Sequence, residues 1–447
     1  MNKRTFLRLV SSAVAGAWIR PLPMLAADAK LTNWSGNIEY GTARLEEAAS
    51  LEQARSIVRS ESKLKVLGTR HCFNTIADST HDLLSLKQMR KIELDPEART
   101  VTVEPGVTYG QLGPYLDSRG FALHNLASLP HISVAGSCST ATHGSGEKNR
   151  NLSSSVAAIE MLTARGDVVK LSRSKDGDNF SGAVVGLGAL GVIMRTTLDI
   201  EPTYQARQYV YENLPLDQMK DHFDEIQASG YSVSLFTDWQ NRRINELWIK
   251  SRVDSNPAFK APQELFGATL ARKNLHPIEA LSAENCTEQM GVPGPWYDRL
   301  PHFRMGFTPS AGKELQTEYL LPRQHAVEAI LAVERLRDSI GPHLLISEIR
   351  TIAADELWMS TCYRQPSVAI HFTWKQDWPS VRNLLPVIER ELSPFRPRPH
   401  WGKLFVMAPA DLRSRYERFS DFVKLASQYD PRGKFRNAFL ETNIFAS

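Results

Sequence analysis

The sequence predicts a mixed α+β fold in two or possibly three domains. The chain has 447 residues, of which 42% are hydrophobic and 23% are charged, as expected of an ordinary globular protein of that many domains. Segments with strand alternation and segments with helical spacing follow one another along the chain. Near Glu201-Pro202 the pattern changes, and longer apolar–polar alternations such as 232–237 follow. These observations indicate a domain boundary close to residue 202.

The first thirty residues are predicted to be an export signal. Lys3 and Arg4 precede an apolar segment at 9–19, and a small-x-small cleavage pattern lies at 25–29. This order is typical of secretory signals, and the apolar segment is too short to span a membrane. The Lys-Arg pair resembles a twin-arginine signal, with a general secretory signal as the alternative. We therefore expect a signal peptide over 1–29, a periplasmic protein (cytoplasmic is the alternative), and no membrane span in the mature chain.

Charge and cysteine content exclude several classes of partner. The net charge is +4, and the lysines and arginines are scattered, so nothing indicates nucleic-acid binding. The four cysteines, Cys72, Cys138, Cys286 and Cys362, match neither zinc spacing nor a dense disulfide framework. We expect free thiols, no metal and no nucleic-acid partner.

The N-terminal half alternates short helices and strands. Apolar residues three and four positions apart predict helices over 45–60 and 109–119, and Gly120 would end the second. Residues 63–66 alternate lysine with apolar side chains, as a half-exposed strand would. The other strand patterns, the last two forming a hairpin, lie at 83–86, 91–94, 100–106, 156–162 and 168–171.

The C-terminal half has longer elements. Helices are predicted over 216–228, 324–339 and 410–429, and 291–296 is a proline-rich loop. Strand alternation over 346–351 and 368–374 places Glu348 with Arg350 on one face, and His371 with Thr373 on another. A charged strand face normally contacts solvent, and the alternative is that these faces line a cavity.

Three glycine-rich stretches could approach a ligand closely. Residues 67–74 form a glycine turn after a strand, with His71 at its tip; taken alone, the stretch favours a strand end with a surface histidine. Residues 127–146 are rich in small and hydroxyl side chains and contain no acidic residue. Their regularly placed aliphatic residues argue against a flexible linker. Residues 182–193 lack the strand–helix context of a dinucleotide fingerprint, and a buried turn is their alternative role.

Together these stretches resemble the flavin-dependent oxidase superfamily typified by vanillyl-alcohol oxidase and p-cresol methylhydroxylase. Within it the similarity is to the sugar and polyol branch, the alditol and aldonolactone oxidases, over nearly all of residues 31–443. The segments that carry it are 32–37, 67–74, 127–146, 232–239, 285–289, 348–351, 400–403 and 430–437.

The resemblance implies a two-domain α+β fold. It consists of a p-cresol methylhydroxylase-type FAD-binding domain over 33–202, an inserted substrate domain on an antiparallel sheet over 203–396, and a C-terminal segment, 397–447, that completes the first domain. FAD would lie between the two domains, its diphosphate held by backbone amides of the glycine-rich stretches.

The resemblance also assigns cofactor residues. His71 matches the histidine that bonds covalently to the 8α-methyl of the flavin ring, in a chemistry that needs a neutral imidazole. This chain has Thr69-Arg70-His71-Cys72 where alditol oxidases commonly have Ser-Gly-His-Ser. The other expected FAD contacts are Leu67, Gly68, Thr69, Arg70, Cys72, Ser128, Ser133, Gly136, Thr140, Ala141, Thr142, His143 and Ile193.

The residues that match the polyol site are Ser128, Glu348, Arg350, His371, Thr373 and Lys403. Lys403 is expected to accept the hydroxyl proton, or to be the immediate partner of the acceptor, provided that burial or Arg350 lowers its pKa. Glu348 and Ser128 would bind chain hydroxyls, and Arg350 would steady the developing alkoxide. The alternative is that Lys403 and Glu348 form a structural ion pair.

The implied activity is oxidation of the terminal hydroxyl of an alditol such as xylitol or sorbitol, with oxygen reduced to hydrogen peroxide. An aldonolactone oxidase, or a dehydrogenase with another electron acceptor, is the nearest alternative. A flavin-binding protein without turnover or a carbohydrate-binding module is a more distant one. The mature chain is expected to be a monomer that interacts only with its small substrate and oxygen.

Overall fold

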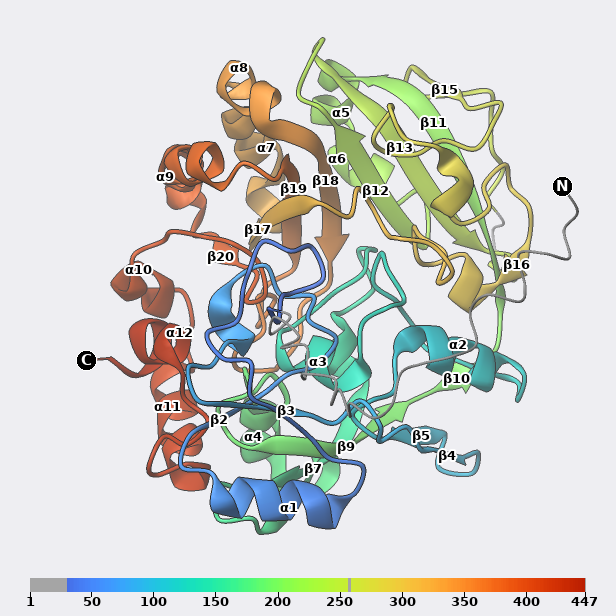
Figure 1. Ribbon diagram of the computed structural model, residues 1–447. Helices are drawn as coiled ribbons and strands as arrows, with labels where there is room; N and C mark the ends of the chain where they lie inside the picture. Colours follow the sequence, from blue (N-terminus) through green and yellow to red (C-terminus); the bar gives the residue numbers. More distant parts are fainter. Residues whose placement is uncertain (1–29, 256–258, 447) are drawn as a thin grey trace, which may run out of the picture. The chain divides into compact units, whose positions relative to one another are not determined.

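Two large sheets organise the protein (Figure 1). The structure is a computed structural model that describes residues 30–255 and 259–446. By its contacts the chain divides into residues 1–30 and 31–447, and only the second unit is considered below. The predicted signal peptide over 1–29 lies outside the described residues. Among the residues that are described, no helix is long and apolar enough to cross a membrane.

The N-terminal half contains a five-stranded antiparallel sheet in the order β4-β5-β9-β7-β8. Its strands are β4 (Ile92–Asp95), β5 (Thr100–Val103), β7 (Val156–Leu162), β8 (Val168–Ser172) and β9 (Val192–Asp199). A small parallel sheet joins β1 (Leu45–Glu47), β2 (Leu64–Val66) and β3 (Asp82–Ser85), and β6 (Phe121–Ala122) pairs with β10 (Glu201–Pro202).

Helices from both ends of the chain pack with this half. The N-terminal ones are α1 (Leu51–Ser60), α2 (Tyr109–Asp117), α3 (Val134–Ser139) and α4 (Arg173–Val184), and the C-terminal ones are α10 (Pro409–Ser414), α11 (Phe419–Tyr429) and α12 (Ala438–Leu440). Leu412, Phe422 and Leu440 belong to the same hydrophobic core as Val101 and Ile159. The C-terminal segment therefore completes the core of the N-terminal half.

The second half forms a ten-stranded antiparallel sheet. Its strands are β11 (Gln205–Pro215), β12 (Ser232–Thr237), β13 (Arg243–Arg252), β14 (Glu264–Leu265), β15 (Ala268–Leu270), β16 (Gly294–Pro295), β17 (Glu314–Pro322), β18 (Leu344–Ile352), β19 (Ser367–Lys375) and β20 (Arg398–Pro399). Its apolar face packs with α5 (Leu216–Asp221), α6 (Phe223–Gln227), α7 (Ala326–Glu334), α8 (Arg337–Ile340) and α9 (Trp378–Leu392). The predicted α+β fold with an antiparallel sheet is confirmed.

The change of sheet falls between Pro202 and Gln205, because β10 pairs within the N-terminal half whereas β11 enters the large sheet. The domain limits at 202 and 396 themselves stay predictions.

Several predicted helices are shorter or interrupted. The helix expected over 45–60 begins at Leu51, because the Ser50 side chain caps it and Leu45–Glu47 pairs with β3 instead. The helices expected over 216–228, 324–339 and 410–429 each divide in two, where backbone angles leave the helical region, as at His222 (φ −125°, ψ 24°). Tertiary packing outweighs helical periodicity at these points.

The structure corrects the half-exposed strand predicted over 63–66 and the solvent contact expected for the strand over 368–374. Lys65 in β2 is only 3% exposed, because its Nζ donates to the carbonyl oxygens of Leu187, Gly188 and Phe435. Strand β19 is buried along nearly its whole length. One of its faces joins the hydrophobic core, and the other, with His371 and Thr373, lines a cavity.

Candidate active site

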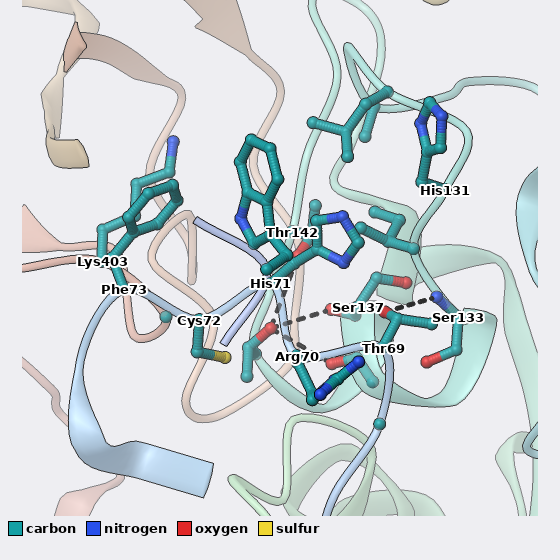
Figure 2. A pocket seen from close by; sticks show the side chains of 18 of the residues that line it. Thr69, Arg70, His71, Cys72, Phe73, His131, Ser133, Ser137, Thr142 and Lys403 are labelled. Atoms are coloured by element: carbon teal, nitrogen blue, oxygen red, sulfur yellow. Dashed lines mark hydrogen bonds between the residues drawn. The ribbon is translucent and has the colours of Figure 1, made fainter. Parts of the chain in front are cut away.

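A cavity of about 730 Å³ is lined by the three glycine-rich stretches and by the polar face of the large sheet. Residues 65–73, 127–143 and 187–193 contribute to one part of its wall, and β17, β18 and β19 contribute to the other. Figure 2 shows His71 with Thr69 and Ser133 on one side and Phe73 and Lys403 on the other. The expectation that the charged strand faces contact solvent is therefore wrong, and the alternative, that they line a cavity, is what the structure shows.

Almost every residue predicted for the site lines this cavity. Those that do are Leu67, Gly68, Thr69, Arg70, His71, Cys72, Ser128, Ser133, Gly136, Thr140, Thr142, His143, Ile193, Glu348, Arg350, His371, Thr373 and Lys403. Ala141 does not, because it is fully buried in the hydrophobic core behind the cavity wall.

The end of the cavity formed by the glycine-rich stretches fits a bulky anionic cofactor. Among the described residues that line the cavity, the only acidic ones are Glu318 and Glu348, and both lie on the sheet. The loops from 67 and 127 meet closely, because a Cβ added at Gly68 would lie 3.3 Å from the Ser133 hydroxyl. Ser133 N also donates to Thr69 Oγ1 at 3.3 Å, which joins the two loops (Figure 2). A flavin nucleotide could thus contact backbone without meeting a carboxylate.

His71 is set up as a neutral imidazole. Burial lowers the pKa of His71 to about 4, with a further contribution from His131. Its Nδ1 is buried and has no hydrogen-bond partner among the described residues. The Trp34 ring stacks on the imidazole, with ring centroids 5.3 Å apart and planes 26° apart. An uncharged ring with an unpaired nitrogen suits a histidine that bonds to carbon.

Neither of the two residues beside His71 forms a hydrogen bond with its ring among the described residues. Arg70 has φ 63°, a left-handed conformation that is uncommon outside glycine, and its Nη1 donates to Thr32 O at 3.1 Å. Burial raises the pKa of the Cys72 thiol to about 11, so it is a neutral group.

On the sheet, pairing brings three ionisable groups into one row. Glu318 of β17 and Glu348 of β18 both lie opposite His371 of β19. Residues two positions apart share a face of a strand, so Arg350 and Thr373 lie on this face too.

Glu318 is the centre of the charge network and was missed by the sequence prediction. Arg350 Nη2 donates to Glu318 Oε1 at 3.0 Å, and Lys403 Nζ donates to Glu318 Oε2 at 2.8 Å. His143 Nε2 lies 3.3 Å from the same oxygen. Burial alone would raise the pKa of Glu318, but Lys403, His143 and Arg350 hold it well below its ordinary value. The available sequence signal was the alternation of Glu314, Gln316 and Glu318 with Leu315, Thr317 and Tyr319.

Glu348 pairs with His302 and Arg350, and does not form the ion pair with Lys403 that was the alternative. It accepts a hydrogen bond from His302 Nε2 at 2.8 Å and lies 3.5 Å from Arg350 Nε. Its pKa would be raised by burial, but Arg350 and His302 lower it well below its ordinary value. The ion pair of Lys403 is with Glu318, so the suggested Lys403–Glu348 pair is wrong. His302 sits in a loop without strand or helix periodicity, and no sequence signal pointed to it.

Lys403 and His371 are the candidate proton acceptors. Burial lowers the pKa of Lys403, whereas Glu318 acts to raise it. Burial and the nearby Lys403 hold the pKa of His371 well below its ordinary value, so this ring is neutral. Neither ring nitrogen of His371 has a hydrogen-bond partner among the described residues. The cavity thus presents hydroxyl-binding groups, a guanidinium and two possible bases around one space.

Two family models match this chain. The one described as an FAD binding domain matches residues 43–172, and the one described as D-arabinono-1,4-lactone oxidase matches residues 309–443. Both matched segments contribute walls to the cavity.

Similarity also extends over more than 90% of the chain in the following relatives. The chain is 46% identical to alditol oxidase of Streptomyces sp., over 92% of this chain and 98% of that one. It is 25% identical to L-gulono-1,4-lactone dehydrogenase of Mycobacterium tuberculosis, over 91% of this chain and 97% of that one. The crystal structure of cholesterol oxidase from B. sterolicum superposes with a TM-score of 0.75 at 13% identity, covering 93% of this chain and 96% of that one. At that identity the likeness shows the fold alone.

Proposed function

Because this chain belongs to the FAD-dependent family of alditol and sugar-1,4-lactone oxidases, we propose that it oxidises the terminal hydroxyl of a linear polyol such as xylitol or sorbitol. The product would be the aldose, and oxygen would be reduced to hydrogen peroxide. The observation that carries the proposal is the joint position of Ser128, Glu348, Arg350 and Lys403 in the cavity that also contains His71. These groups offer paired donors and acceptors, as a chain of hydroxyls requires.

FAD, when bound, supplies the acceptor for the hydride of the substrate carbon and passes two electrons on to oxygen. The protein supplies the rest. Ser128 and Glu348 bind substrate hydroxyls, and Arg350 stabilises the oxygen that becomes negative as its proton leaves. Lys403 accepts that proton in its uncharged form, and the neutral His371 beside it can orient the hydroxyl or share the proton.

A substrate panel tests the proposal. Purified protein should produce peroxide in air with xylitol or sorbitol, at a higher kcat/KM than with gulonolactone. Peroxide from the lactone alone would favour the alternative suggested by the D-arabinono-1,4-lactone oxidase match. Flavin reduction by polyol without peroxide would indicate a dehydrogenase, and no reduction by any polyol would refute the proposal.

We also propose that His71 carries the flavin covalently. One ring nitrogen would replace a hydrogen of the 8α-methyl, two protons would be released, and the electron pair would pass through the flavin to oxygen. The neutral, unpaired imidazole supports this role. The His71→Ala variant should therefore release its yellow colour upon acid precipitation, whereas the wild type should keep it.

A His81→Ala variant is the matched control, because His81 is exposed and lies outside the cavity lining. It should retain the flavin as the wild type does. Flavin that stays attached in His71→Ala would show that the link is elsewhere, and flavin released by the wild type would show that no link exists.

Replacing Glu318 with glutamine should move the pH dependence of kcat to lower pH. A lysine base is active when deprotonated, so the rate rises as the pH passes its pKa. Glu318 is the group that most raises the pKa of Lys403, from 2.8 Å away. In the Glu318→Gln variant the pKa of Lys403 should fall, so the rate of polyol oxidation should begin to rise at a lower pH. A limb that stays in place or moves to higher pH would contradict Lys403 as the base.

We also propose that residues 1–29 are a signal peptide that directs export to the periplasm. The mature protein is proposed to be a monomer. Cell fractionation tests the periplasmic location, and size-exclusion chromatography tests the monomeric state.

A further inference from the structure

A buried lysine lies behind the cavity wall and contacts His302, a histidine that lines the cavity. Lys250 of β13 is 1% exposed, and its Nζ donates to Leu300 O at 2.5 Å and Pro301 O at 3.0 Å. The same Nζ lies 3.0 Å from Nδ1 of His302. Burial lowers the pKa of Lys250 to about 7, but only the ammonium form can satisfy all three acceptors.

This arrangement decides which nitrogen of His302 carries a proton. Burial, helped by the charge of Lys250, lowers the pKa of His302 to about 4, so the ring is neutral. Since Nδ1 accepts from Lys250, the proton is on Nε2, which donates to Glu348 Oε1 at 2.8 Å. The rings of Trp248 and Phe236 meet the imidazole edge-on, with centroids 5.1 Å and 5.5 Å away, and fix its plane.

The hydrogen bond from His302 also selects the oxygen of Glu348 that is left for a ligand. Oε1 is occupied by His302 and lies 3.5 Å from Arg350 Nε. Oε2 has no hydrogen-bond partner among the described residues, and Glu348 lines the cavity. A substrate hydroxyl can therefore donate to Oε2 of Glu348, while the hydrogen bond from His302 to Oε1 restrains rotation of the carboxylate.

The same segment holds a second hydroxyl-binding group. The backbone N–H groups of His302 and Phe303 both donate to Ser128 O, at 2.8 Å and 3.1 Å. Arg350 Nη1 donates to the Ser128 hydroxyl at 3.1 Å. Residues 300–303 thus tie Ser128, from a glycine-rich loop, to Glu348, from the large sheet.

We propose that Lys250 and His302 are positioning residues that aim Glu348 and Ser128 at the polyol. Lys250 sets the tautomer of His302, and His302 orients Glu348 through its ring and Ser128 through its backbone. The inference rests on the proposed function, because the hydroxyls to be positioned are those of the substrate. Lys250 lies outside the cavity lining, and His302, which lines the cavity, acts through Glu348 and Ser128.

A purely structural role makes a different prediction from a positioning role. If the Lys250–His302 pair only stabilises the fold, its loss should lower flavin content, thermal stability and both half-reactions together. If it positions Glu348, its loss should damage the step that involves polyol and leave the reaction of the reduced enzyme with oxygen intact.

The experiment compares His302→Phe, His302→Gln and Lys250→Met with the wild-type holoenzyme. Glutamine can place an N–H near the position of His302 Nε2, whereas phenylalanine only fills the space. The rate of flavin bleaching by xylitol without oxygen and the rate of reoxidation by oxygen are measured separately by absorbance. His124→Phe is the matched control, because His124 is a largely buried histidine outside the cavity lining.

His302→Phe should raise the xylitol concentration for half-maximal bleaching by roughly 10- to 100-fold, the equivalent of one hydrogen bond to a charged group. His302→Gln should recover much of this loss, Lys250→Met should be intermediate, and reoxidation should be unchanged in all three. An equal loss in both half-reactions, or a His302→Gln variant as damaged as His302→Phe, would overturn the inference. If His302→Phe does not fold, the split between half-reactions in Lys250→Met and His302→Gln decides.

The outcome is separable from that of the proposed function. If wild-type enzyme is bleached by gulonolactone and not by any polyol, the proposed function fails. The same variants then test positioning with the lactone, whose hydroxyls would need the same carboxylate. An unchanged bleaching rate in every variant would refute positioning for either substrate.

Discussion

Replacing Lys403 with methionine should slow the reduction of the flavin by polyol by roughly 10²- to 10⁴-fold, the range of a lost general base. Methionine keeps most of the apolar stem of the side chain but cannot accept a proton. The affected quantity is the rate of anaerobic bleaching at saturating xylitol, measured by stopped-flow absorbance. Reoxidation by oxygen should stay close to that of the wild type, because the proton of the substrate is not involved in it.

Lys375→Met is the control, since Lys375 is exposed at the end of β19 and its Nζ donates to Pro342 O. That variant should bleach at the wild-type rate. A Lys403→Met variant with nearly normal bleaching would assign the proton to His371 instead. In that case His371→Phe should show the decrease in bleaching rate that is predicted here for Lys403→Met.

Replacing Arg350 with methionine should damage both activity and stability. Arg350 is the one described cation that contacts Glu318, Glu348 and Ser128 together. Its removal leaves two buried carboxylates short of a partner, and breaking buried pairs of this kind costs about 3–5 kcal/mol. Loss of its stabilisation of the alkoxide should also slow polyol oxidation by roughly 10²- to 10³-fold. Thermal unfolding and bleaching kinetics measure the two effects.

The stability loss should depend on pH in a defined direction. Arg350 is the strongest of the groups that hold the pKa of Glu348 below its ordinary value. A depressed carboxyl pKa contributes stability that is present above the ordinary pKa and is lost as the pH falls through the depressed one. In the variant, burial raises the pKa of Glu348, so protonation relieves the unpaired charge. The difference in Tm between Arg350→Met and the wild type should therefore be largest at neutral pH, and it should become smaller as the pH falls towards about 4.

Arg335→Met is the matched control, because Arg335 pairs with Glu391 at 3.4 Å on an exposed helix surface. Surface pairs contribute about 0–1 kcal/mol, so its Tm should barely change. A difference between Arg350→Met and wild type that widens at acid pH would contradict the role given to Glu348.

These expectations treat the site as one buried charge network. Glu318 joins the proposed base to the proposed alkoxide-stabilising group, since it bonds to both Lys403 and Arg350. A substrate hydroxyl entering between them meets groups whose charges are already fixed by one another. Such preorganisation lets the donors act without rearranging during the reaction.

The sequence alone determined which residues could share a face and which stretches could approach a ligand. Side chains alternate along a strand with a period of two, so the sequence by itself places Glu348 with Arg350, and His371 with Thr373, whatever the strand pairing. Small residues over 127–146 marked a backbone that can come close to a cofactor, and the resemblance added His71 and Lys403. These are local properties, or matches to a family, and they need no three-dimensional information.

The tertiary structure decided which of these faces meet. Strand pairing set Glu318 and Glu348 on either side of His371, and a loop from 300–303 brought His302 to Glu348. Periodicity could not predict that Lys65 and Lys250 are buried, because a charged side chain can be buried wherever distant carbonyl groups supply its hydrogen bonds. The pairing of a buried charge depends on contacts between segments far apart in the chain, and only the folded arrangement brings those segments together.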